Sequence, residues 1–212
     1  MAKKIKGSSK GPSKGSGKGS GGNQWADHLT QRARSENYPA RSVYKLEEIQ
    51  KKFKVILPAS QVLDLGCAPG SWLLYAAKQV GSKGRVFGID LKPIEIKLPE
   101  NVIAIQDNIL SLENEGFLAE GFGAVLSDMA PATTGRKDVD AFRSFELCSM
   151  ALETAKKFLA ANGNFVCKIF QGNEFKKFER EVKSVFRECK TFKPESCRKQ
   201  SKEIYIIGKG KK

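Results

Sequence analysis

The chain switches repeatedly between two patterns of apolar residues, and the order of these switches predicts its architecture. Short apolar runs bounded by turn residues are typical of strands, whereas apolar residues three or four positions apart are typical of helices. The first pattern predicts strands at 61–65, 84–90, 102–106, 124–128 and 164–170. The second predicts helices at 25–35, 42–53, 71–80, 111–120, 141–160 and 174–186, and Asn162-Gly163 is expected to stop the long helix.

The last part of the chain departs from this alternation. Two strand patterns, 189–192 and 203–207, follow one another with no helical pattern between them, so we expect an antiparallel pair. Strands that otherwise alternate with helices form an open, mostly parallel sheet covered on both faces. We therefore predict an α/β fold of the Rossmann-like type, with a seven-stranded sheet and an antiparallel C-terminal strand.

Composition and charge then separate the first residues from the rest. Residues 1–22 hold six Lys, many Gly and Ser and no acidic residue, so they are predicted to form a disordered basic tail ahead of a single domain at 23–212. The whole chain has 37 Lys and Arg against 23 Asp and Glu, a net charge of +14. Without the tail, 31 basic residues still face 23 acidic ones. This excess favours nucleic acid over an acidic membrane surface as the partner, with a solubilising surface as the plainer alternative.

The helices within 23–56 would face RNA phosphates through a set of basic residues, unless this is only a solvated helix face. The set is Arg32, Arg34, Arg41, Lys51 and Lys52. The five Cys include no Cys-x-x-Cys pair and His28 is the only His, so no zinc site is predicted and His28 receives no catalytic role. Unpaired thiols and the lack of a membrane-spanning apolar run favour a reduced, cytoplasmic protein.

Polar residues, with Asp64 the first of them, close several predicted strands at the edge where open α/β sheets bind ligands. After the first strand, Gly66 and Gly70 would let the backbone approach a ligand at a helix start. The loop lacks the G-x-G-x-x-G spacing of a dinucleotide site, which disfavours a nicotinamide-dependent oxidoreductase. Asp90 closes the second strand, where a carboxylate can accept hydrogen bonds from ribose hydroxyls, and Asp107 or Asn108 after the third could meet an adenine amino group.

A second group of polar residues suggests proton transfer. It comprises Lys45, Asp128, Lys168 and Glu203. Lys168 lies in an otherwise apolar strand pattern, where a Lys is rare unless it is paired or functional. Burial and a nearby Lys45 would lower the pKa of its ammonium, and the two acids would orient it, so that it could take a proton from an alcohol such as a ribose hydroxyl. An exposed structural ion pair is the alternative.

These residues lie in longer runs that together resemble one family. The runs are Arg41-Ser-Val-Tyr-Lys-Leu-Glu-Glu-Ile-Gln50, Asp64-Leu-Gly-Cys-Ala-Pro-Gly-Ser-Trp72, Ser127-Asp-Met-Ala-Pro131, Lys168-Ile-Phe-Gln-Gly172 and Ser201-Lys-Glu-Ile-Tyr-Ile206. Over roughly residues 34–208 the chain resembles the FtsJ/RrmJ (RlmE) family of ribose 2′-O-methyltransferases. The resemblance implies S-adenosylmethionine as cofactor and a catalytic Lys–Asp–Lys–Glu tetrad, with Lys168 as the proton acceptor, at Lys45, Asp128, Lys168 and Glu203.

The resemblance also implies the cofactor contacts, which are Gly70, Trp72, Asp90, Asp128 and either Asp107 or Asn108. The family's Pro-Gly-Gly-Trp reads Pro-Gly-Ser-Trp here, and Ser71 suits a helix cap, so cofactor binding is expected to survive. The family's Gly-Asp after the third strand reads Asp107-Asn108, which leaves the adenine contact open between the two.

The substrate follows from the resemblance alone. It implies a monomeric enzyme that acts on large-subunit (23S) ribosomal RNA, at a uridine of the A-loop in the assembled 50S subunit. Two alternatives stay open at this point. One is the same chemistry on tRNA, and the other is a non-catalytic ribosome-assembly protein that binds RNA, which loss of a tetrad residue would favour; all four are present.

Overall fold

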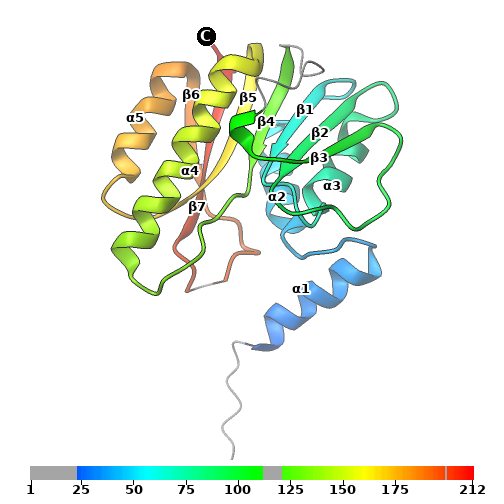
Figure 1. Ribbon diagram of the computed structural model, residues 1–212, viewed down its shortest axis with the longest axis horizontal. Coiled ribbons are helices and arrows are strands. Elements are labelled where there is room, and N and C mark those ends of the chain that lie inside the picture. Colours follow the sequence, from blue (N-terminus) through cyan, green and yellow to red (C-terminus); the bar gives the residue numbers. More distant parts are fainter. Residues whose placement is uncertain (1–22, 112–120, 199) are drawn as a thin grey trace, which may run out of the picture.

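The computed structural model describes residues 23–111, 121–198 and 200–212 (Figure 1). Its elements follow the predicted order of helices and strands. They are α1 (Asn23–Ser35), α2 (Val43–Phe53), β1 (Gln61–Leu65), α3 (Ser71–Val80), β2 (Arg85–Asp90), β3 (Val102–Gln106), the 3-10 turn η1 (Ile109–Ser111), β4 (Phe122–Ser127), α4 (Lys137–Phe158), β5 (Leu159–Phe170), α5 (Phe175–Val185), β6 (Phe186–Phe192) and β7 (Glu203–Lys211).

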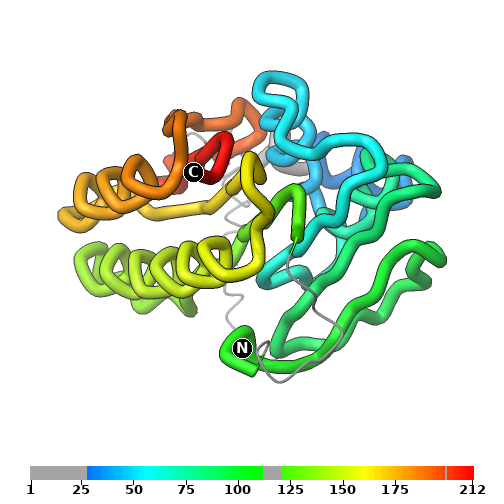
Figure 2. Tube along the Cα trace, turned by 90° about the horizontal axis from the view of Figure 1, so that it is seen from above, coloured from blue at the N-terminus to red at the C-terminus, as the bar shows by residue number. Residues whose placement is uncertain are grey.

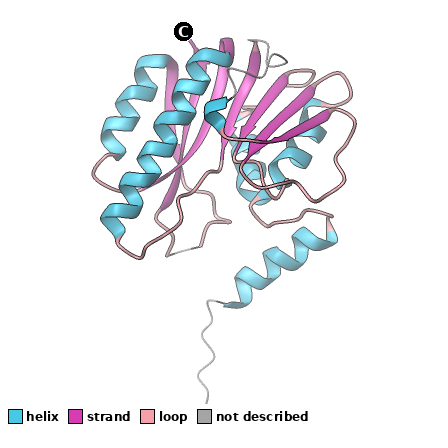
Figure 3. Ribbon diagram, viewed as in Figure 1, coloured by secondary structure: helices cyan, strands magenta, loops and turns pink. Residues whose placement is uncertain are grey.

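All seven strands form one sheet in the order β3-β2-β1-β4-β5-β7-β6 (Figure 3). The pairs among β1 to β5 are parallel, while β7 runs antiparallel to both β5 and β6. The Rossmann-like fold with an antiparallel C-terminal strand is therefore confirmed. The strand order reverses at β1, so the carboxyl ends of β1 and β4 border the crevice where sheets of this kind bind ligands.

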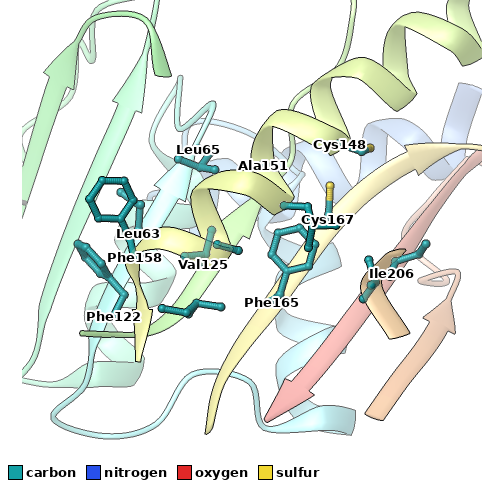
Figure 4. Close-up of a cluster of buried hydrophobic side chains, with 14 of the residues drawn as sticks. Leu63, Leu65, Phe122, Val125, Cys148, Ala151, Phe158, Phe165, Cys167 and Ile206 are labelled. Atoms are coloured by element: carbon teal, nitrogen blue, oxygen red, sulfur yellow. The ribbon is translucent and has the colours of Figure 1, made fainter. Parts of the chain in front are cut away.

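Helices cover both faces of the sheet, and each face has its own apolar core (Figures 1 and 2). On one face, α4 and α5 cover inward side chains of the central strands, such as Leu63, Val125 and Phe165 (Figure 4). On the other, α2 and α3 pack against alternate positions of the same strands, such as Val62 and Leu126. The alternation follows from the period of two in a strand, which sends neighbouring side chains to opposite faces.

The helix predicted at 141–160 is displaced in the structure. It starts earlier, at Lys137, and ends at Phe158, because Leu159 is extended and opens β5 by pairing with Phe122. Asn162, with a φ of 65°, therefore lies inside the irregular start of β5 instead of stopping the helix. Pairing with β7 likewise starts β6 at Phe186 and carries β7 to Lys211. Residues that pair with a neighbouring strand adopt the strand conformation even where their own sequence pattern does not predict it.

Two predictions fall on residues that the structure does not describe. The tail at 1–22 lies outside the described residues, as does the helix predicted at 111–120 apart from Ser111, which ends η1. The division into a tail and one domain therefore stays a prediction. In the described part of the chain, no helix combines the length and apolar character needed to span a bilayer.

Candidate active site

The four residues of the predicted tetrad come from separate parts of the chain and meet at one end of the sheet. Asp128 directly follows β4, and Lys168 lies in the neighbouring strand β5, one position after the Ser127–Cys167 pair. Glu203 starts β7 opposite Phe170 of β5. Lys45 is supplied by α2, which packs over this face of the sheet.

Two ion pairs join these residues. The Lys168 Nζ lies 3.0 Å from Asp128 Oδ1 and also donates to the Asp128 backbone carbonyl. The Lys45 Nζ lies 2.8 Å from Glu203 Oε1. The Lys168 side chain is 7% exposed, which excludes the alternative of a lysine at an open strand end. Little water reaches these pairs to screen their charges, so loss of one partner would leave the other charge buried without compensation.

The two pairs also influence each other. Burial lowers the pKa of Lys45, but the charges of Asp128 and Glu203 more than offset it and leave that pKa raised. Burial raises the pKa of Glu203, yet Lys45 and, more weakly, Lys168 leave it lowered. Both shifts favour the charged forms. Lys45 and Glu203 therefore stay ionised within the cluster.

Tyr205 joins this cluster and was not predicted. It stands opposite Lys168 in the β5–β7 pair, and its fully buried hydroxyl donates to Asp128 Oδ1 at 2.6 Å. Burial, then the charge of Asp128, raises the pKa of Tyr205 well above its usual range, so the hydroxyl keeps its proton and remains a donor. A signal existed in the sequence, because Tyr205 lies two positions after Glu203 and so shares its face of the strand.

Replacing Tyr205 with phenylalanine tests this role. The ring would keep its place beside Trp72, with centroids 6.1 Å apart, while the hydrogen bond to Asp128 is lost. A bond to a charged group is worth about 1.5–3 kcal/mol, so we expect turnover to fall by roughly 10- to 150-fold. Single-turnover kinetics of methyl transfer would measure the loss. An unchanged rate would show that Asp128 is positioned without Tyr205.

The predicted cofactor loop lies next to the tetrad. A small cavity there is lined by Ser42, Gly66, Cys67, Ala68, Pro69, Ser71, Trp72 and Asp128. Gly66 and Gly70 have φ values of 76° and 104°, in the left-handed region that favours glycine. A Cβ on Gly66 would lie 2.4 Å from Met129 Cγ. The glycines therefore let the loop pass close to the end of β4.

Three neighbours of this loop show how it is held. The Asp90 carboxylate accepts hydrogen bonds from the backbone of Ala68 at 2.9 Å and of Lys92 at 2.9 Å, so it ties the loop to the end of β2. The Trp72 indole donates to the Ser42 carbonyl at 2.9 Å. The capping role expected of Ser71 is wrong, because Gly70 is the N-cap and the Ser71 hydroxyl bonds to the backbone of Ala40 instead.

Asp64 closes the first predicted strand, and sequence reasoning gave it no role in the site. It lies within β1 and is 1% exposed, and neither of its carboxylate oxygens has a hydrogen-bond partner among the described residues. Burial, then the charges of Asp128 and Asp90, raises the pKa of Asp64 well above its usual range. The signal was an acidic residue in an apolar strand. Burial this deep therefore favours the protonated, uncharged form of Asp64.

Asp107 and Asn108 follow β3 as predicted, at the same end of the sheet. The Asp107 carboxylate accepts from the Asn108 backbone N–H at 2.6 Å through Oδ1. The exposed Asn108 uses its own Oδ1 to accept from Leu110 at 3.1 Å, which caps η1. This geometry leaves both residues as candidates for the adenine contact.

Comparison with known proteins assigns this site to a family. Residues 38–211, most of the chain, match the model of the FtsJ-like methyltransferases. The chain belongs to this family. The ribosomal RNA large subunit methyltransferase E of Desulforapulum autotrophicum is 65% identical over 192 residues, which are 90% of this chain and 95% of that protein. The protein of that name from Desulfatibacillum aliphaticivorans is 53% identical and covers 90% of this chain and 93% of its own.

Solved structures of other proteins superpose on this chain. A ribosomal RNA methyltransferase from Plasmodium falciparum superposes with a TM-score of 0.73 at 26% identity, over 82% of this chain and 98% of that one. Fibrillarin from Aeropyrum pernix, with natively bound S-adenosylmethionine, has a TM-score of 0.62 at 17% identity, over 79% and 76%, and shows likeness of fold alone. The predictions of an FtsJ-type methyltransferase and of S-adenosylmethionine as its cofactor are confirmed.

Of the basic residues predicted to meet RNA, Arg32 and Arg34 lie on α1, Lys51 and Lys52 on α2, and Arg41 in the turn before α2. Figure 1 shows α1 at the same end of the sheet as the tetrad. Arg32 pairs with Glu36 at 2.7 Å and Lys51 with Glu47 at 2.6 Å, so part of this charge is balanced within the fold. Lys52 lies over the ring of Phe192 at 4.6 Å. RNA binding by these helices stays a prediction, and His28 is exposed on α1.

Proposed function

We propose that this protein transfers a methyl group from S-adenosylmethionine to the 2′-hydroxyl of a ribose in 23S ribosomal RNA, at a uridine of the A-loop in the 50S subunit. The observation that carries the proposal is the buried Lys168–Asp128 pair at the end of β4 and β5, beside the glycine-rich loop. The relatives' shared name supports the large-subunit substrate, and the presence of the whole tetrad speaks against a non-catalytic protein.

The cofactor would be held by the residues around the loop. S-adenosylmethionine supplies an activated methyl group on a positively charged sulfur. Gly70 and Trp72 would flank it, Asp90 would accept from its ribose hydroxyls, and Asp107 or Asn108 would face its adenine. Asp128, which lines the cavity beside the loop, would supply negative charge for a ligand that carries positive charge. Together, these five contacts would give the ligand carboxylates for its positive charge and hydroxyls, and a glycine backbone that it can approach closely.

The tetrad divides the remaining work. Lys168 takes the proton of the ribose hydroxyl as the oxygen attacks, so the hydroxyl becomes a nucleophile without a free alkoxide. Asp128 holds the Lys168 Nζ at 3.0 Å and so fixes the direction of the amine. Lys45 and Glu203, paired at 2.8 Å, place a further cation and carboxylate beside the reacting groups. Catalysis then rests on alignment and on one proton transfer.

The setting of the reaction follows from the substrate. We propose that the protein works in the cytoplasm as a monomer, with the basic helices α1 and α2 on RNA phosphates. The five free cysteines support a reducing compartment.

A labelling experiment tests the proposal. The protein is incubated with S-adenosylmethionine labelled in its methyl group and with either 50S subunits or tRNA, both from cells that lack the enzyme. We expect label in 23S RNA only, at one nucleotide whose mass rises by one methyl group and whose 2′ position resists alkaline cleavage. Label only on tRNA would reject the proposed substrate, and label on neither would favour a non-catalytic role.

A further inference from the structure

A second cavity lies beside the tetrad and belongs to no part of the site described above. Its volume is about 170 Å³, and it is lined by Lys137, Asp140, Phe170, Ser201 and Lys202. This is room for about five or six water molecules. It suits one flat ring better than a large ligand, since pockets for drug-sized molecules begin at about 300 Å³.

We propose that this cavity receives the nucleobase of the nucleotide that is methylated, with Phe170 as the stacking face and Lys137 and Lys202 on the adjoining phosphates. The inference rests on the proposed function, because it needs an RNA substrate whose ribose reaches Lys168. It adds a base-binding subsite to a reaction that otherwise concerns only the sugar.

The position of Phe170 carries the first step. Phe170 follows Lys168 by two residues on β5 and stands opposite Glu203 of β7. Residues two apart on a strand share a face and lie about 7 Å from one another. A base on the Phe170 ring would therefore hold its own ribose near the Lys168 amine, since only the sugar separates a base from its 2′-hydroxyl.

The chemistry of the walls carries the second step. Bases in single-stranded RNA are recognised by stacking on aromatic side chains, and half-buried Phe170 presents such a ring. Asp140 places a carboxylate in the wall, which disfavours a phosphate inside the cavity and leaves it for an uncharged base. The exposed Lys137 and Lys202 then offer their charges to the phosphates outside.

The wall opposite Phe170 is held in place before RNA arrives. The Asp140 carboxylate accepts hydrogen bonds from the Thr134 backbone at 2.8 Å, the Thr134 hydroxyl at 2.9 Å and the Gly135 backbone at 3.2 Å. These bonds fasten the loop before α4 to the helix itself. On the other side, the Gln171 backbone donates to the Lys202 carbonyl at 2.9 Å and joins the end of β5 to the segment before β7. A cavity with fixed walls orders its ligand at little cost.

A double-mutant cycle tests the inference. Wild type and Phe170→Ala are compared on two RNA substrates, one intact and one lacking only the base at the nucleotide that wild type methylates. We expect Phe170→Ala to lower kcat/KM on intact RNA by about 5- to 150-fold, the range for loss of one stacked base. On the abasic RNA it should cause almost no further loss, because the two changes remove the same contact. Phe170→Trp should retain most activity.

Matched variants separate the loss of base stacking from damage to the fold. Phe142→Ala removes an exposed aromatic ring of α4 that does not line the cavity, and it should keep wild-type kinetics. Phe170→Ala should bind S-adenosylmethionine with the wild-type dissociation constant in calorimetry. Lys137→Ala and Lys202→Ala should each reduce the salt dependence of RNA affinity by about one phosphate contact, whereas Lys190→Ala on the edge strand β6 should not.

The outcomes are distinct. Equal losses on intact and abasic RNA, or no loss from Phe170→Ala on either, would overturn the base-binding subsite while wild type still methylates the RNA. A wild-type protein that labels no large-subunit RNA would instead overturn the proposed function itself.

Discussion

Replacing Lys168 with alanine is expected to lower the turnover of methyl transfer by about 10²- to 10⁴-fold, the usual contribution of a positioned proton acceptor. The amine is buried and aimed at the end of β4 by Asp128, 3.0 Å away. Nothing in the proposed cofactor contacts requires Lys168. The affinity for S-adenosylmethionine should therefore stay close to that of wild type.

The measurement pairs single-turnover methyl transfer with calorimetry of cofactor binding. Removing one partner of a buried ion pair can cost about 3–5 kcal/mol of stability, so Lys168→Met, which keeps the apolar stem, is measured beside Lys168→Ala. Lys190→Ala, a lysine of the outer strand β6, controls for loss of general positive charge. A variant that binds the cofactor and turns over like wild type would rule out Lys168 as the base.

Most of the fold could be predicted because each element has a single pattern of apolar residues, either that of a strand or that of a helix. The strands β1 and β3 and the helix α3 have the predicted bounds, since each is a short apolar run or a helical face between turn residues. The boundary between α4 and β5 could not be predicted, because Leu159 is apolar like the residues at the end of the helix and continues the helical pattern. Its extended conformation comes from pairing with Phe122, 37 residues earlier in the chain. Contacts at that separation leave no local pattern.

The candidate site shows the same division. Lys168 was found because a charge in an apolar strand is conspicuous. Asp64 was recognised as a polar residue at the end of the first predicted strand, but its type and position gave no sign that its carboxyl lacks a hydrogen-bond partner. Tyr205 is an ordinary strand residue by type, and only the register of β5 against β7 places its hydroxyl on Asp128. Sequence reasoning therefore found the charged partners, while the neutral residue that joins them needed the structure.

Replacing Asp128 with asparagine is the second change with a large expected effect. Asp128 Oδ1 receives both the Lys168 amine and the Tyr205 hydroxyl, at 3.0 and 2.6 Å. Asparagine keeps the size of the side chain but loses its charge, so two bonds worth about 1.5–3 kcal/mol each are weakened. We expect turnover to fall by about 10²- to 10⁴-fold, with weaker cofactor binding as well, since Asp128 lines the cavity beside the glycine loop.

Combining this change with Tyr205→Phe shows whether Asp128 is the centre of the cluster. If Tyr205 acts through Asp128, the double variant should be hardly slower than Asp128→Asn alone, because both substitutions break the same bond. Glu203→Gln is the matched comparison, since it removes a carboxylate that pairs with Lys45 and should cause a smaller loss. Losses that multiply fully for Asp128 and Tyr205 would mean that the two act separately. The alignment of Lys168 would then depend on its strand and on the Asp128 backbone carbonyl more than on the carboxylate.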